Sequence, residues 1–104
     1  MAKEVLLVLS TFGNADEARR VARLLVEERL AACVNVIPAI ESIYRWEEKV
    51  ETATEVLVLI KTTSDRYPAL EARIKALHSY ELPEVLAFRA HDGLPGYLRW
   101  VEAC

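Results

Sequence analysis

Apolar residues gather in runs that predict four β-strands. The runs lie at residues 4–10, 32–46, 50–62 and 84–89. A tight polar turn, Glu47-Glu48-Lys49, separates the second run from the third. Since strands are typically about 5–6 residues long, these two segments predict an unusually long β-hairpin.

Between the predicted strands, apolar residues recur at helical spacing and predict two helices. Asn14 is suited to cap a first helix, and Glu17 three residues later fits a capping box. The apolar positions that follow at helical spacing are Ala18, Val21, Ala22 and Leu25. A second helix is expected to open at residues 64–65, to carry Pro68 in its first turn, and to end near His78.

The order strand, helix, strand, strand, helix, strand predicts an α+β fold of the ferredoxin-like split βαββαβ plan. Residues 1–104 then form one domain, with both helices on one face of an antiparallel sheet and a short C-terminal helix at 97–101. Pro38 cannot donate a ladder hydrogen bond, so the second strand belongs at a sheet edge or on a bulge. Residues 56–60 are continuously apolar, which predicts a central strand that is covered on both faces.

The outer half of the hairpin is too long for two helices to cover. Ile40, Tyr44 and Trp46 alternate along it and therefore share one face. In a single subunit these side chains would lie in water beside an open edge strand, which is an aggregation hazard. We expect the chain to form a homo-oligomer through this face; a hairpin that folds back over its own sheet is the alternative.

Composition excludes several classes of partner. The net charge is −3, which argues against nucleic acid. No apolar run approaches the ~18 residues of a membrane helix, and no secretory signal is recognised, so we expect a cytoplasmic protein without a membrane partner. The two cysteines do not make a disulfide framework. Cys33 lies in an apolar run and is predicted to be a buried, inert thiol.

Motifs for the common functions of this fold are missing. No Cys-x-x-Cys pair follows the first strand to hold a soft metal. Residues 56–61 carry no aromatic side chain for stacking on RNA bases. The loop at 11–16 has one glycine and no basic residue, which does not suit an anion cradle. We find no catalytic apparatus and expect that the protein is not an enzyme.

One cluster of chemically competent side chains remains after the second helix. His78, Tyr80, Glu81 and Glu84 lie within seven residues, and imidazole and carboxylate groups together can bind a divalent ion. The alternative is a helix-terminating loop in which a charged histidine favours the helix C-terminus. The residues alone leave both interpretations open.

Six motifs in this order and spacing resemble the CutA family of divalent-cation tolerance proteins. They are RLAACVN at 29–35, Ile37-Pro38, SIYRW at 42–46, IKTT at 60–63, HSYELPE at 78–84 and YLRW at 97–100. Together they span nearly the whole chain.

The resemblance implies a ferredoxin-like fold and a tight homotrimer assembled through the long hairpins. It also implies a cytoplasmic protein linked to tolerance of copper and other divalent metal ions, with no established enzymatic activity. Such trimers resemble those of the PII nitrogen-signalling proteins, which suggests a role in signal transduction.

Two of the three copper ligands of some relatives are replaced in this chain. Those ligands are a cysteine at the end of the first strand and two adjacent histidines, and the matching positions here are Ser10, Leu77 and His78. A hydroxyl and a leucine do not replace a thiolate and an imidazole as copper ligands. If a divalent metal ion binds, we expect His78 to bind it with Glu84 or Glu81, across a subunit boundary in the trimer.

Three functional hypotheses follow from these residues, the last of which is a purely structural scaffold that binds neither a metal ion nor a small ligand. The first is a non-enzymatic trimer that binds copper or another divalent ion weakly. The alternative is a PII-like signalling module whose inter-subunit clefts bind a small anion or a partner protein, with Lys61, Tyr80 and Glu84 as candidate contacts. Trp46 and Trp100 are expected to anchor the interface or the core, so the predicted interface residues are Ile40, Tyr44, Trp46 and Trp100.

Overall fold

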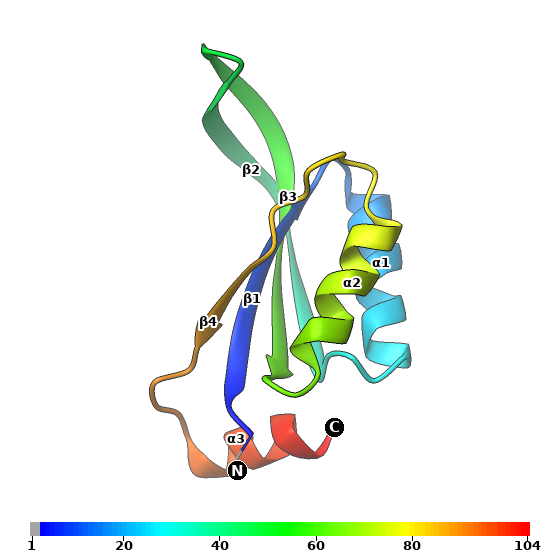
Figure 1. Cartoon of the computed structure of the whole chain (residues 1–104), viewed down its shortest axis with the longest axis vertical. Helices are drawn as coiled ribbons and strands as arrows, with labels where there is room; N and C mark the ends of the chain where they lie inside the picture. The colour runs from blue at the N-terminus through cyan, green and yellow to red at the C-terminus, as the bar shows by residue number, and fades with distance from the viewer. Residues whose placement is uncertain (1–2) are drawn as a thin grey trace.

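The computed structural model describes residues 3–104 and has an α+β architecture (Figure 1). Its elements are β1 (Val5–Phe12), α1 (Ala15–Glu27), β2 (Cys33–Trp46), β3 (Lys49–Thr63), α2 (Tyr67–Leu77), β4 (Leu86–Arg89) and α3 (Pro95–Ala103). The predicted sequence of strands and helices is confirmed. The four strands form one antiparallel sheet in the order β2-β3-β1-β4, so β3 and β1 are central.

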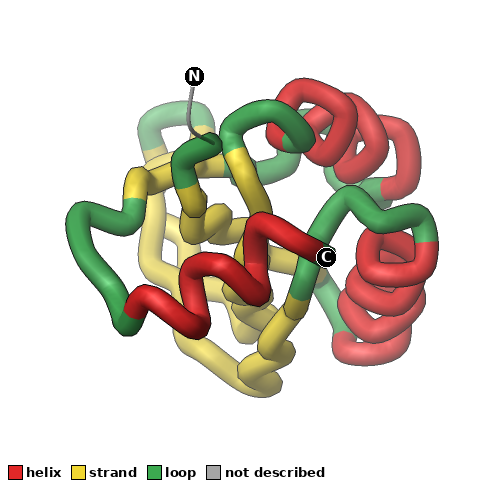
Figure 2. The backbone as a smooth tube through the Cα atoms, turned by 90° about the horizontal axis from the view of Figure 1, so that it is seen from below, coloured by secondary structure: helices red, strands yellow, loops and turns green. Residues whose placement is uncertain are grey.

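Both long helices pack on the same side of the sheet, as Figures 1 and 2 show. The core lies between them and the sheet, because alternate residues of β1 and β3 are buried there. Its largest fully buried apolar members are Val8, Phe12, Val21, Leu25, Val58, Ile60, Leu70 and Ile74. Alternation in the strands and helical spacing in α1 therefore converge on one core.

The first helix begins as predicted. The Asn14 side-chain oxygen accepts a hydrogen bond from the Glu17 backbone N–H at 2.8 Å. The reciprocal half of a capping box is not formed, because the Glu17 carboxylate instead accepts two hydrogen bonds from Ser79, at 3.0 and 3.1 Å. Glu17 thus connects the start of α1 to the segment that follows α2.

Loss of the Asn14 cap should destabilise the protein modestly. We expect Asn14→Ala to lower the free energy of unfolding by about 1 kcal/mol, because the Glu17 N–H loses its acceptor. Chemical denaturation of both proteins at one concentration measures the difference. Asn14→Ser, which keeps a capping oxygen, is the control, and an equal loss in that variant would contradict a capping role.

The hairpin of β2 and β3 projects beyond the helices (Figure 1). Its turn is the two residues Glu47 and Glu48, both with positive φ (49° and 68°), as in the hairpin turns that match strand twist. The bulge predicted at Pro38 is confirmed by the register shift between Ile37 and Ile40, where Ala39 also has a positive φ of 63°. β2 is in addition an edge strand.

The prediction that β3 is covered on both faces is wrong for the single chain. The face turned away from α1 and α2, called the outer face below, carries an apolar set that is only half-buried or exposed. This set is Leu7, Leu9, Leu57, Leu59, Leu86 and Phe88. Cys33 pairs with Lys61 on the same face and is half-buried rather than buried. A continuous apolar run indicates a strand whose two faces can both be buried, but it does not say whether the second face is buried by the same chain or by another one.

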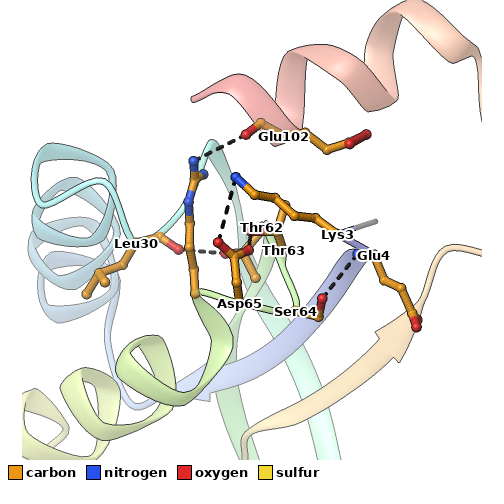
Figure 3. A network of polar contacts seen from close by, with 9 residues as sticks. Lys3, Glu4, Leu30, Thr62, Thr63, Ser64, Asp65 and Glu102 are labelled. Carbon is orange, nitrogen blue, oxygen red and sulfur yellow. Dashed lines mark hydrogen bonds and ion pairs between the residues drawn. The ribbon is translucent and has the colours of Figure 1, made fainter. Parts of the chain in front are cut away.

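Several boundaries differ from the predicted ones. β1 continues to Phe12 because it stays paired with Val56 of β3. β4 begins only at Leu86, and α3 is longer than predicted, at nine residues. α2 begins at Tyr67 rather than at residues 64–65, for a reason visible in Figure 3.

None of the helices in the described part of the chain is long and apolar enough to cross a membrane.

Polar contacts at the end of β3 connect it to both ends of the chain (Figure 3). The Ser64 hydroxyl accepts from the Glu4 N–H, and Asp65 accepts from the Thr63 hydroxyl and pairs with Lys3 at 3.7 Å. These side chains are thus used to hold β1 rather than to cap α2. The Arg66 guanidinium donates to the Glu102 carbonyl of α3 at 3.4 Å, so α3 is held across the end of the sheet.

Candidate functional site

The segment between α2 and β4 crosses the sheet at the base of the projecting hairpin (Figure 1). Hydrogen bonds hold it at three points: His78 to β1, Ser79 to Glu17 of α1, and Tyr80 to Glu55 of β3. Gly13 permits the close approach, because a Cβ there would lie 3.3 Å from the Tyr80 hydroxyl oxygen. The segment is therefore positioned by three other elements.

His78 faces inward and uses both ring nitrogens. Nδ1 accepts from the Tyr80 backbone N–H at 3.0 Å, so Nε2 carries the proton and donates to the Thr11 carbonyl at 2.7 Å. The ring also stacks on Phe12, with centroids 4.3 Å apart and planes at 14°. Only 9% of His78 is exposed. A metal ion could bind this imidazole only if one of the two hydrogen bonds were broken.

The Tyr80 ring also lies close to the His78 ring, with centroids 4.7 Å apart and planes at 48°. Its hydroxyl donates to the Glu55 carboxylate at 2.8 Å. Partial burial, and then this hydrogen bond to a carboxylate, raise the pKa of Tyr80 to about 12. At neutral pH the group is consequently a neutral phenol with a fixed orientation.

A cleft of about 390 Å³ opens beside Tyr80, between the crossing segment and the hairpin. Its lining residues come from three strands and the crossing segment: Thr11, Tyr44, Trp46, Glu55, Tyr80, Glu81, Leu82 and Glu84. We call it the aromatic-acid cleft, because three of these residues are aromatic and three are glutamates. Its size suits a small molecule or an inserted side chain.

The predicted site residues divide between separate places. Tyr80, Glu81 and Glu84 line the aromatic-acid cleft, whereas His78 is not among its lining residues. Lys61 is six residues farther along β3 than Glu55, about 20 Å in an extended strand, and it donates to Asn35 of β2. The residues proposed for a ligand cleft are therefore not brought together within one subunit.

No preformed metal centre is found within residues 3–104. Among these residues, no three histidine, cysteine, aspartate or glutamate side chains gather closely enough to hold one ion. Ser10, at the position of the relatives' cysteine, is fully buried, and its hydroxyl has no hydrogen-bond partner in the described chain. The available donors, one imidazole and carboxylates, do not make the thiolate-containing set that favours tight copper binding.

The predicted interface residues are exposed to different degrees. Ile40, Tyr44 and Trp46 share the outer face, as expected from their alternation. Tyr44 is 43% and Trp46 53% exposed, while Ile40 is half-buried. Trp100 is 47% exposed on α3, where its ring lies 5.7 Å from that of Tyr97. All four remain available for contact with another subunit.

The sequence alone does not indicate that Glu55 accepts the Tyr80 hydroxyl, nor that residues of β4 lie on the outer face. Glu55 lies in a long extended run, and nothing local marks it as the acceptor of the Tyr80 hydroxyl. Leu86 and Phe88 alternate in the short run at 84–89, and that alternation is the one signal that could have identified an apolar outer face. Both are about half exposed.

Comparisons with known proteins agree over nearly the full length. Residues 6–104 match the family model described as CutA1 divalent ion tolerance protein. The divalent-cation tolerance protein CutA of Thermus thermophilus is 47% identical over 96 residues, which cover 92% of this chain and 93% of that protein. Protein CutA of Mus musculus is 50% identical over 92 residues, which cover 88% of this chain and 52% of the longer mouse protein.

Solved structures give the same result. The crystal structure of CutA1 from Oryza sativa superposes with a TM-score of 0.93 at 41% identity and covers 96% of this chain and 92% of that chain. The divalent cation tolerance protein from Thermus thermophilus superposes with a TM-score of 0.91 at 46% identity, with coverages of 93% and 94%. The fold is therefore shared together with a substantial part of the sequence.

Proposed function

The chain belongs to the CutA1 family of divalent ion tolerance proteins, and we propose that it acts as a non-enzymatic homotrimer that binds divalent metal ions weakly. Family membership over residues 6–104 is the observation that carries this proposal. We further propose that the domain, residues 1–104, has the full ferredoxin-like topology, which the strand order β2-β3-β1-β4 supports.

Assembly is supported by the surface that a single subunit leaves bare. The outer face and the projecting hairpin expose apolar side chains on both edge strands of the sheet, Phe88 on β4 and Trp46 on β2 among them. Apolar surface of this kind is a usual site of subunit contact. A homotrimer would also cover the unpaired edge of β2.

Weak binding follows from the state of His78. To bind an ion, its imidazole must lose the bond to Thr11 or the one to Tyr80, and leaving a buried polar group unpaired costs about 1–3 kcal/mol. Glu81 and Glu84 lie on the exposed side of the same segment. We propose that these carboxylates and His78 meet an ion at a subunit boundary, with copper as one candidate ion.

Replacement of His78 tests the metal proposal. Native mass spectrometry with a few equivalents of copper per subunit should show a trimer that gains one ion per subunit, and His78→Ala should lose that uptake. The matched control is His91→Ala, which changes the other histidine, an exposed one. Scattered uptake that is equal in all three proteins would refute the proposed ligand. The oligomer mass recorded in the same spectra checks that each variant still assembles.

The aromatic-acid cleft favours a second candidate function. A PII-like signalling module would bind a small ligand or a partner protein at such a place, and Tyr80, Glu81 and Glu84 line the cleft. Thermal shifts with metal-free protein distinguish this function from metal binding, since a ligand that binds only the folded state raises the melting temperature.

We also propose a cytoplasmic location. The two cysteines of the described chain, Cys33 and Cys104, are free thiols. Free thiols are the usual state in a reducing compartment. Cell fractionation with an antibody to the untagged protein examines this directly.

A further inference from the structure

The loop between β4 and α3 combines a sequence and a geometry that favour a covalent rearrangement of the backbone. We propose that Asp92 converts spontaneously to isoaspartate through a succinimide formed with the backbone nitrogen of Gly93. In Figure 1 the loop bows away from the sheet, and residues 90–93 include none of the residues expected or proposed to contact another subunit. The modification does not depend on metal or ligand binding.

The first step forms one bond to carbon and breaks another. The Gly93 amide nitrogen attacks the Asp92 Cγ, and the amide proton leaves together with the carboxyl hydroxyl as water. A water molecule then opens the succinimide at one of its two carbonyl carbons. Opening at Cγ restores aspartate, whereas opening at the backbone carbonyl carbon gives isoaspartate, in which the chain runs through the former side chain. Water is the only co-reactant.

The reacting groups of Asp92 and Gly93 already lie together. The Gly93 N–H donates to the Asp92 Oδ1 at 3.0 Å, which holds the nitrogen beside the carboxyl group that it attacks. Glycine has no Cβ to crowd the approach, and it allows the backbone rotation that ring closure requires. Both residues are exposed, so water can reach the succinimide. Residues 91–93 make no backbone-to-backbone hydrogen bond within residues 3–104, so little opposes the rearrangement.

The other two aspartates of the chain, Asp16 and Asp65, lack this arrangement. After Asp16, the next backbone N–H donates to the Asn14 side chain at 2.8 Å, at the start of α1. After Asp65, the next backbone N–H donates to the Thr63 carbonyl at 3.1 Å. Each is also followed by a residue whose side chain crowds the nitrogen. Both neighbouring amides are thus turned away from the carboxyl group that would have to be attacked.

Rearrangement at Asp92 would alter the start of α3. Isoaspartate adds one methylene group to the backbone that joins β4 to α3. Gly93 lies close against Leu98, because a Cβ on Gly93 would be only 2.9 Å from the Leu98 Cδ2. A longer connection displaces Gly93 from Leu98, so we expect the first turn of α3 to open more often and its amides to exchange faster.

Peptide mapping after prolonged incubation of the protein in neutral buffer tests the proposal. Trypsin releases residues 90–99, because arginines precede and end this segment. We expect a second form of this peptide with the same mass and a different retention time, which endoproteinase Asp-N does not cut at residue 92. Asp92 should contain at least about tenfold more isoaspartate than Asp16 or Asp65, because its reacting groups are already positioned. A sample digested without incubation measures any rearrangement during digestion.

Two variants distinguish this chemistry from general damage. Asp92→Glu keeps the charge but lengthens the side chain, which disfavours ring closure, so it should give no isomeric peptide. Asp92→Asn should reach the same isoaspartate product faster, with release of ammonia, because a neutral amide is attacked more readily than a carboxylate. Hydrogen exchange of residues 94–98 should become faster on incubation in the wild type and in Asp92→Asn, and should stay constant in Asp92→Glu.

Three results would overturn these expectations. Absence of the isomeric peptide 90–99, under an incubation that converts the Asp92→Asn protein, would mean that the folded loop prevents ring closure. Equal isoaspartate at the three aspartates would mean that the geometry at Gly93 has no effect. Unchanged hydrogen exchange of residues 94–98 in the rearranged protein would show that the contact of Gly93 with Leu98 does not hold α3.

Discussion

Phe88→Lys is expected to convert the proposed trimer into monomers. Phe88 is 50% exposed on β4 and lies beside Leu7 on the outer face, outside the core between sheet and helices. Full burial of a phenylalanine side chain contributes about 1.5–3 kcal/mol, and half of Phe88 is already covered in the single chain. Three copies in a trimer would therefore lose roughly 2–5 kcal/mol, before the cost of burying an ammonium group is added. Lysine itself is well tolerated on an edge strand of a monomer.

Sedimentation equilibrium measures this effect as the change from three subunit masses to one. The matched control is Val26→Lys, which places the same charge on a similarly exposed apolar residue of α1, 42% exposed and away from the outer face. A Phe88→Lys protein that remains trimeric would exclude the outer face as the interface. A wild-type protein that sediments as a monomer at micromolar concentration would exclude the trimer.

Phe12→Ala is expected to lower the free energy of unfolding by about 3–5 kcal/mol. Phe12 is 1% exposed at the end of β1, and its ring supports the His78 imidazole by stacking. Alanine there would leave a cavity in the core between the sheet and the helices, next to the His78 ring. It would also remove the surface that holds His78 in line with Thr11 and Tyr80.

Guanidinium denaturation, with all proteins at one concentration, measures the loss, because assembly makes apparent stability depend on concentration. Leu94→Ala is the control, since Leu94 is 75% exposed and its removal should change stability by less than about 0.5 kcal/mol. A loss below about 1 kcal/mol for Phe12→Ala would mean that the site repacks and that Phe12 does not hold the crossing segment.

The fold separates side chains that lie close together in the sequence. His78, Tyr80, Glu81 and Glu84 are neighbours in the chain, and their spacing predicts one cluster. In the fold, His78 turns inward to the Thr11 carbonyl, while the other three line the aromatic-acid cleft. Adjacent residues in an irregular segment can point in opposite directions, so proximity in sequence did not predict a shared site.

The bulge at Pro38 illustrates how a local feature acquires a distant consequence. Before the bulge, Ile37 of β2 lies opposite Leu57 on the outer face; after it, Ile40 lies opposite Glu55 on that same face. Three steps along β2 thus match two steps along β3. Because side chains alternate, the extra residue reverses which set faces outward and brings Tyr44 to the face of Glu55.

The sequence by itself determined the elements, their order and the family, because those depend on local signals. Apolar spacing, the Asn14 cap and the position of Pro38 act over a few residues, and the structure confirms the elements that each of them predicts. Only the tertiary structure decided that one face of β3 stays uncovered, that His78 is fully hydrogen-bonded, and that Glu55 meets Tyr80. The two hydrogen bonds join residues that are 25 and 67 positions apart. They depend on the strand register and on the path of the crossing segment, and neither of these has a local signature in the sequence.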